Sequence, residues 1–209
     1  MQPDPQDTIE FHNQIRSKLN GFERARTHQS ADALKPAAVT IALLGSVREP
    51  AFLLTRRASH LRAHGGQWAL PGGRQDPGEH AVQTALRELD EELGLRLDEH
   101  SVLGTLDDYP TRSGYLITPV VVWAGIKPRL EPNPDEVDSV HEVPIAQIAA
   151  ADAVDFTRIP ESDRPVIRIR IMDNLVHAPT AAILYQFREL LAGRITRVAQ
   201  LEQPRFAWR

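Results

Sequence analysis

The stretch of sequence that decides the fold runs from residue 73 to residue 95 and reads GRQDPGEHAVQTALRELDEELGL. Its second half places apolar side chains at helical spacing, at Ala81, Ala85, Leu86, Leu89 and Leu93. Gly94 follows at the position where helices commonly end in a left-handed residue. The pattern therefore predicts a helix over residues 80–93.

Four carboxylates lie in this predicted helix beside the cation Arg87, at Glu88, Asp90, Glu91 and Glu92. Spacings of three and four residues place Glu88, Glu91 and Glu92 on one helix face. A cluster of hard oxygen ligands is typical of Mg²⁺ or Mn²⁺ sites. The alternative is a solvated acidic face on which Arg87 pairs with Glu91 one helical turn away.

The spacing around the cluster favours the metal site. Five residues separate Gly73 from Glu79, and seven separate Glu79 from Arg87. Arg-Glu-Leu, one residue, Glu-Glu, one residue and Gly-Leu then complete the pattern over residues 87–95. The whole pattern resembles the Nudix box at every specified position. This resemblance implies a Nudix hydrolase with an α/β (α+β) fold, an α/β/α sandwich around a mixed sheet.

The resemblance also implies roles for residues of the motif. Glu88, Glu91 and Glu92 would bind Mg²⁺ or Mn²⁺ together with the backbone carbonyl of Gly72, while Arg87 would orient a neighbouring carboxylate. Ions held there would neutralise a diphosphate and activate water for attack on phosphorus. Because Nudix enzymes take the general base from the helix or from a later loop, Glu88 and Glu136 are both candidates.

The residues before the box resemble the additional signature of the coenzyme A diphosphatases, a Nudix subfamily. The matching stretches are LLTRR at 53–57, LRAHGG at 61–66 and LPGG at 70–73. Two positions depart from that signature, since Ala58 stands in place of a serine and Leu70 in place of a phenylalanine. The matching positions Arg57, Arg62 and His64 are the expected substrate-binding residues, and the two arginines suit phosphate.

The subfamily resemblance continues at Ser113-Gly114-Tyr115, at 117–121 and at 135–137. It implies cleavage of coenzyme A or its derivatives to 4′-phosphopantetheine and adenosine 3′,5′-bisphosphate. Two alternatives stay open. Pro110, fifteen residues after Leu95, resembles a proline of the Nudix enzymes that act on ADP-ribose. A Nudix-fold binding module without turnover would usually lack box glutamates, and all of them are present here.

The rest of the chain supplies the elements around the box. An amphipathic N-terminal helix over 8–26, docked on the domain or on the partner of a homodimer, is predicted from Phe11, Ile15, Leu19 and Phe22. Strands are predicted at 37–47, 52–55, 102–109, 116–123, 137–143 and 166–172, and short helices at 144–150 and 180–191. Residues 58–78 are rich in glycine and predict mostly irregular backbone. The expected divisions are an N-terminal helical extension at 1–36, a Nudix domain at 37–195 and a C-terminal tail at 196–209.

Composition narrows the class of protein and its partners. The 209 residues carry a net charge of −4, 42% hydrophobic residues and no cysteine, which excludes disulfides and thiolate metal sites. The negative charge argues against nucleic acid as a partner, and no apolar run reaches membrane-spanning length. The expected partner is a small nucleotide, coenzyme A or an acyl-CoA. The start of the chain lacks a signal-peptide pattern, so a cytoplasmic location is expected.

Overall fold

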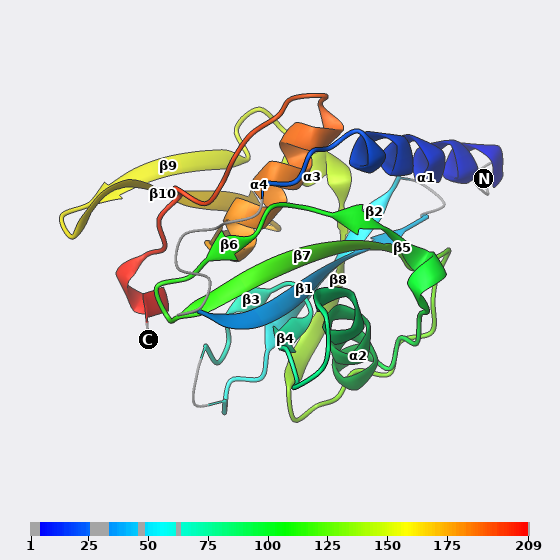
Figure 1. The fold of residues 1–209 in the computed structure, drawn as a ribbon, viewed down its shortest axis with the longest axis horizontal. Helices are drawn as coiled ribbons and strands as arrows, with labels where there is room; N and C mark the ends of the chain where they lie inside the picture. Colours follow the sequence, from blue (N-terminus) through cyan, green and yellow to red (C-terminus); the bar gives the residue numbers. More distant parts are fainter. Residues whose placement is uncertain (1–4, 26–33, 46–48, 62–63, 209) are drawn as a thin grey trace.

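The computed structural model describes residues 5–25, 34–45, 49–61 and 64–208. A mixed sheet lies between helices in Figure 1, with α2 (Ala81–Leu93) on one face. Helices α1 (Pro5–Asn20) and α4 (Thr180–Leu191) lie on the other face. The predicted α/β/α sandwich with an additional N-terminal helix is therefore confirmed.

The main sheet has eight strands in the described residues and combines parallel and antiparallel pairs. They are β1 (Lys35–Leu44), β2 (Ala51–Arg57), β3 (Trp68–Ala69), β4 (Gly72–Arg74), β5 (Val102–Thr105), β6 (Tyr109–Pro110), β7 (Tyr115–Trp123) and β8 (Val137–Pro144). Strand β1 runs parallel to β7, from the pair Lys35–Tyr115 to the pair Leu43–Trp123. Because β1 is also antiparallel to β2 and β4, it holds the glycine-rich β4 in the middle of the sheet.

Strand β1 is buried on both faces, which explains its nearly continuous apolar sequence. Side chains alternate between the faces of a strand, so Ile41 and Leu43 join one core while Ala42 and Leu44 join the other. The first core includes residues of α1 and α4, and the second lies under α2. Each outer layer of the sandwich thus has its own hydrophobic core against the sheet.

A second sheet of three antiparallel strands in the described residues follows the main one. It consists of β9 (Val154–Ile159), β10 (Ser162–Ile171) and β11 (Asn174–His177). The sequence predicts only the C-terminal part of β10, at 166–172, because the apolar side chains alternate most clearly there. Its neighbours are short and partly exposed, and Asp155 and Arg158 interrupt the apolar pattern of β9.

The N-terminal helix ends six residues earlier than the predicted position 26, at Asn20, and Gly21 follows. Its Ile15 and Leu19 are buried, and the helix contacts β5 and α4 of the same chain. The helix therefore docks on its own domain, which is the first of the two predicted arrangements.

The predicted strand at 102–109 is divided into β5 and β6, and this corrects the sequence-based prediction. Asp107 and Asp108 interrupt it because their buried carboxylates bind side chains from outside the sheet. Gln186 Nε2 donates to Asp107 at 2.7 Å, and Arg24 forms an ion pair with Asp108. These contacts attach α4 and the segment after α1 to the sheet.

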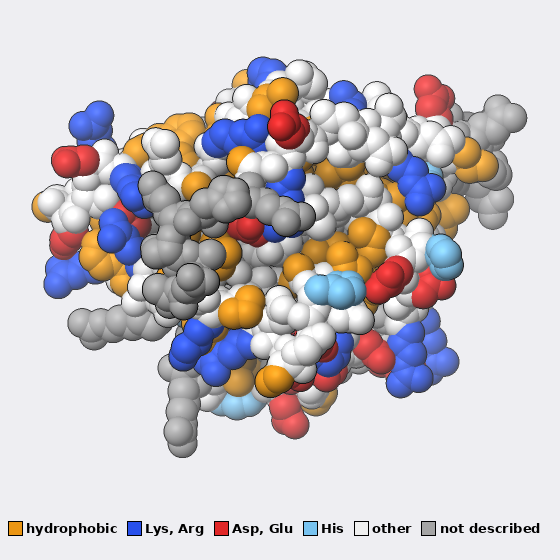
Figure 2. Space-filling view, in the orientation of Figure 1, with side chains coloured by type: hydrophobic (Ala, Val, Ile, Leu, Met, Phe, Trp, Pro, Cys, Tyr) orange, Lys and Arg blue, Asp and Glu red, His pale blue; other side chains and the backbone are white. Residues whose placement is uncertain are grey.

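The remaining helical segments match the predictions closely. Helix α3 spans Ile145–Ala149, and α4 begins and ends at the predicted residues. Two 3₁₀ turns, at Glu99–Ser101 and Arg205–Trp208, are additional. No helix in the described residues is long and apolar enough to cross a membrane. On the face drawn in Figure 2, basic and acidic side chains lie intermingled.

Candidate active site

Helix α2 is bounded by caps that its sequence supplies. The backbone N–H of Gln83 donates to His80 Nδ1 at 3.4 Å, and the His80 N–H donates to Gln83 Oε1 at 3.0 Å. This reciprocal pair is a capping box with histidine as the N-cap residue. At the other end, Gly94 has a φ of 63° and its N–H donates to the Asp90 carbonyl. The caps fix where the helix presents its acidic residues.

Arg87 connects this helix to the loop that precedes it. Its Nε donates to Glu79 Oε1 at 2.8 Å, and its Nη2 donates to the Arg74 carbonyl at 3.0 Å. Its Nη1 donates to Glu88 Oε1 and Glu91 Oε2, both at 2.9 Å. The hydrogen bond from Arg87 lowers the pKa of Glu79 to about 2, so this carboxylate stays charged. Arg87 therefore orients three carboxylates at once.

Glu92 is a buried carboxyl group beside Gly72 and Gly73, which we call the glycine turn. Its side chain is only 4% exposed, and its Oε2 accepts a 3.3 Å hydrogen bond from the Gly72 N–H. Arg57 Nη1 lies 3.6 Å from Glu92 Oε1. Burial raises the pKa of Glu92 to about 8, although the charge of Arg57 opposes the rise. A bound cation would compensate this carboxylate further.

Glu88 lies directly against Gly73. A Cβ at Gly73 would overlap the Glu88 carboxylate, and a Cβ at Gly72 would overlap the Ala38 carbonyl oxygen. Glycine is thus required at both positions because the acidic helix and β1 approach their backbone so closely.

Glu88 also has a raised pKa. Burial raises this pKa, the ion pair with Arg87 opposes the rise, and the charges of Glu91 and Glu136 add to the rise.

The carboxylate oxygens of Glu88, Glu91 and Glu92 are ligands that suit a hard divalent cation. Only two of the three carboxylates lie where they could share such an ion. Glu88 and Glu92 adjoin the glycine turn, whereas the half-exposed Glu91 carboxylate is bound to Arg87. Within the described residues, no three acidic or histidine side chains converge as a ready-made ion site. Participation of Glu91 would require its carboxylate to leave Arg87.

Glu136, the second candidate for the general base, lies in the loop before β8. Its carbonyl accepts a 2.9 Å hydrogen bond from the Ala58 N–H, at the end of β2. Asn133 Nδ2 lies 3.4 Å from Glu136 Oε1. Because the charge of Glu136 also contributes to the raised pKa of Glu88 and Glu92, all three carboxylates belong to one electrostatic unit.

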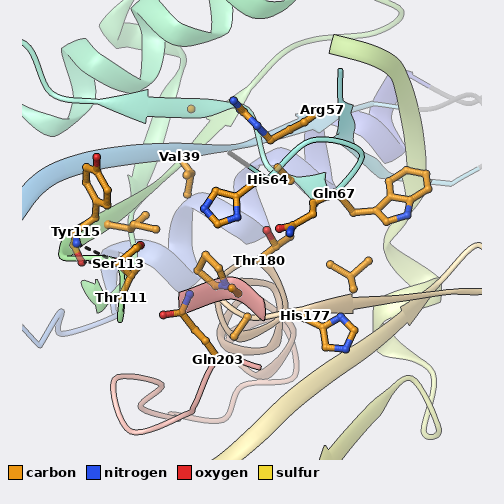
Figure 3. A pocket seen from close by; sticks show the side chains of 18 of the residues that line it. Val39, Arg57, His64, Gln67, Thr111, Ser113, Tyr115, His177, Thr180 and Gln203 are labelled. Atoms are coloured by element: carbon orange, nitrogen blue, oxygen red, sulfur yellow. Dashed lines mark hydrogen bonds between the residues drawn. The ribbon is translucent and has the colours of Figure 1, made fainter. Parts of the chain in front are cut away.

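A cavity of about 720 Å³ opens beside the glycine turn. Gly72 and Gly73 line it together with the predicted substrate residues Arg57 and His64, which Figure 3 shows on the same side of the cavity. His64 has a φ of 57°, a left-handed conformation uncommon for a residue with a side chain. Arg62 lies outside the described residues, so its predicted role stays a prediction.

The far side of the cavity comes from parts of the chain to which the motifs give no role. Figure 3 shows Thr180 and Gln203 across the cavity from Arg57. His177 also lines it, as do Leu175 and Phe206. No local sequence motif marks these residues, because they are brought to the cavity by the packing of the second sheet and of residues 201–208.

Comparison with known proteins identifies the class to which this arrangement belongs. The model of the NUDIX domain family matches residues 34–166, which is more than half of the chain. The chain therefore belongs to the Nudix hydrolases, enzymes that generally cleave nucleoside diphosphate derivatives. A relative from Yersinia pestis (strain Pestoides F), named "Uncharacterized Nudix hydrolase NudL", is 39% identical over 142 residues, which are 65% of this chain and 69% of the relative.

Solved structures show the same fold at low sequence identity. A Nudix hydrolase from Nitrosomonas europaea is similar with a TM-score of 0.54 and 17% identity, over 81% of this chain and 78% of that one. The Nudix hydrolase RenU from M. smegmatis is similar with a TM-score of 0.51 and 22% identity, over 78% of this chain and 90% of that one. At these identities the likeness supports the fold alone.

Proposed function

We propose that this Nudix hydrolase cleaves the diphosphate of coenzyme A or its derivatives, releasing 4′-phosphopantetheine and adenosine 3′,5′-bisphosphate. One observation carries the proposal. The residues that resemble the coenzyme A diphosphatases come from separate stretches of the chain, and several of them line the cavity beside the glycine turn, including Arg57, His64, Ser113 and Tyr115. Convergence on one cavity is expected of residues that bind one ligand.

The two departures from the signature do not weaken this proposal. Ala58 and Leu70 are each 3% exposed, and neither is among the described residues that line the cavity. Leu70 belongs to the hydrophobic core on the side of α1 and α4. Both residues are therefore packed in the interior and do not belong to the described lining of the cavity.

The acidic side chains have distinct parts in the proposed reaction. Glu88, Glu91, Glu92 and the Gly72 carbonyl would hold Mg²⁺ or Mn²⁺, the hard cations that suit their oxygen ligands. When bound, such a cation supplies charge neutralisation of the diphosphate and lowers the pKa of water. Arg57 partly compensates Glu92 and reaches the cavity, where its guanidinium suits a phosphate. Glu88 or Glu136 accepts the proton of the attacking water.

The competing substrate within the family is ADP-ribose, suggested only by Pro110. This proline lies in β6, where it pairs with Leu116 of β7, and it is not among the described residues that line the cavity. Pro110 is therefore accounted for as a residue of a short strand, and its position gives no support to ADP-ribose as the substrate. The competing class, a binding module without turnover, has no support from the box, in which each glutamate is retained.

The test is a substrate panel with the purified full chain. Coenzyme A, ADP-ribose, NADH and deoxynucleoside triphosphates are incubated with Mg²⁺ or Mn²⁺, and the products are separated by chromatography. We expect coenzyme A to have the highest kcat/KM and to yield 4′-phosphopantetheine and adenosine 3′,5′-bisphosphate. Faster cleavage of ADP-ribose would overturn the substrate assignment, and absence of turnover with tight nucleotide binding would favour the binding module.

A further inference from the structure

The last residues of the chain are fastened to the domain by buried polar contacts. We call residues 201–208 the terminal segment; it lies beyond the part of the chain matched by the family model. Its Glu202 is 2% exposed and accepts hydrogen bonds from Arg112 Nη2 at 2.5 Å and Ser162 Oγ at 2.7 Å. Tyr109 donates from its hydroxyl to the Leu201 carbonyl at 2.9 Å. These contacts give the segment a defined position.

That position makes the terminal segment a wall of the active-site cavity. Gln203, Phe206 and Ala207 line the cavity from this segment. Residues 175–180, from β11 and the start of α4, continue the same side. In Figure 3, Thr180 and Gln203 of this wall lie across the cavity from Arg57. A ligand that reaches across from the glycine turn would therefore contact the terminal segment.

The two sides of the cavity differ in charge. Among the described lining residues, the arginines are Arg57 and Arg74, and both belong to the side of the glycine turn. The opposite wall presents Leu175 and Phe206, which are 42% and 58% exposed, beside uncharged polar groups. The Phe206 ring packs edge-on against His177, with 5.1 Å between the ring centroids. Large apolar side chains left exposed on a cavity wall indicate a binding surface.

We propose that the terminal segment, with residues 175–180, forms a subsite for an uncharged, largely apolar chain of the substrate that extends away from the diphosphate. Phe206 provides its main apolar contact, and the exposed Leu175 lies on the same wall. This inference rests on the proposed function, in which the pantetheine arm and any acyl group of coenzyme A form such a chain. Phosphates stay on the arginine side.

The experiment compares three substrates that contain an ADP group: ADP-ribose, coenzyme A and octanoyl-CoA. They differ in the group attached to the diphosphate, and the two coenzyme A compounds also carry a 3′-phosphate, so the comparison of coenzyme A with octanoyl-CoA isolates the acyl chain. Phe206→Ala should lower kcat/KM about tenfold for octanoyl-CoA and about threefold for coenzyme A, because apolar contact area is lost. For ADP-ribose the change should stay below about twofold. Phe206→Leu should restore most of the loss. The control is Ile195→Ala, at an isoleucine that is 70% exposed and is not among the described lining residues.

Equal losses on the three substrates would overturn the inference, since they would indicate a structural effect or contact with the shared adenosine. Unchanged kinetics of Phe206→Ala would overturn it as well. The wild-type rates test the proposed function separately. If ADP-ribose is the better substrate, the inhibition constant of octanoyl-CoA against ADP-ribose still reports on the subsite, and it should rise in Phe206→Ala and stay constant in Ile195→Ala.

Discussion

The Gly72 N–H and the Glu92 carboxylate form a hydrogen bond of 3.3 Å between residues that lie twenty positions apart. This bond fastens the glycine turn to the last turn of α2. The Glu92 side chain is only 4% exposed, and its nearest cationic partner in the described residues, Arg57, lies 3.6 Å away. Glu92 therefore has little compensation for its burial. A buried carboxylate with so little compensation costs stability, and such groups are retained mostly where they bind something.

Glu92→Gln should abolish most of the activity while preserving the fold. The amide keeps the shape of the side chain and loses the charge that binds a divalent ion, so we expect kcat/KM to fall at least about a hundredfold. Thermal unfolding without metal should show a Tm equal to or above that of the wild type, because the amide avoids the free-energy cost of burying the Glu92 carboxyl group, a cost that raises its pKa to about 8. Near-normal turnover by the folded variant would refute the metal-site assignment.

A matched control separates loss of this carboxylate from loss of any acidic group. Glu142 lies on β8 with an exposed side chain, and Glu142→Gln makes the same chemical change outside the cavity lining. Its activity and its dependence on Mg²⁺ or Mn²⁺ should match the wild type. Titration of metal binding by calorimetry should detect weaker binding in Glu92→Gln alone.

Glu88→Gln and Glu136→Gln should identify the general base. Removal of a general base costs about 10² to 10⁴ in rate, whereas removal of a neighbouring carboxylate at saturating metal costs little. The kcat of each variant is measured at metal concentrations that restore full binding. If kcat is retained in both variants, neither residue is the base.

Most of the sandwich is predictable because its signals are local. The apolar spacing from Ala81 to Leu93 and the cap at Gly94 define α2, and the apolar run of β1 marks a strand buried on both faces. The edges are harder to predict. Strands β9 and β11 depend on pairing with β10, and partly exposed strands with charged residues carry little periodic signal.

One part of the candidate site could be predicted from the sequence, and the other part could not. The residues of the box and of the stretch before it follow from fixed spacings, which place Glu88, Glu92 and His64 near the glycine turn. The opposite wall does not follow from any spacing. Phe206 lines the cavity from a segment that is held in place by contacts such as the ion pair between the buried Glu202 and Arg112. Such contacts between residues about ninety positions apart leave no local pattern.

Glu202 should make the stability of the protein depend on acid. Burial alone would raise its pKa, but hydrogen bonds from Arg112, Ser162 and the Gln203 N–H prevail and lower the pKa to about 2. Since the unfolded value is 4.5, its contribution is complete above about pH 4.5 and is lost as the pH falls towards 2. The Tm deficit of Glu202→Gln should therefore shrink between pH 5 and pH 3.

The exposed ion pair between Glu161 and Arg205 provides the comparison for this effect. Its atoms lie 3.0 Å apart, and the Arg205 side chain is 72% exposed. Exposed pairs contribute about 1 kcal/mol or less, so Glu161→Gln should have a small Tm deficit at every pH. A deficit of Glu202→Gln that stays constant from pH 5 to pH 3 would contradict the assigned pKa.

Arg62 should govern the preference for the 3′-phosphate of coenzyme A over its 3′-dephospho form. It belongs to the chain segment between Arg57 and the glycine turn, and an arginine contact to phosphate contributes about 1.5–3 kcal/mol, or roughly tenfold to a hundredfold. Arg62→Ala should lower kcat/KM for coenzyme A and leave that for the dephospho form nearly unchanged. The matched control is Arg56→Ala, since the exposed Arg56 donates to the Gly66 carbonyl at 3.3 Å and is not among the described lining residues. Equal use of both substrates by the wild type, or equal losses in both variants, would show that the 3′-phosphate is bound elsewhere.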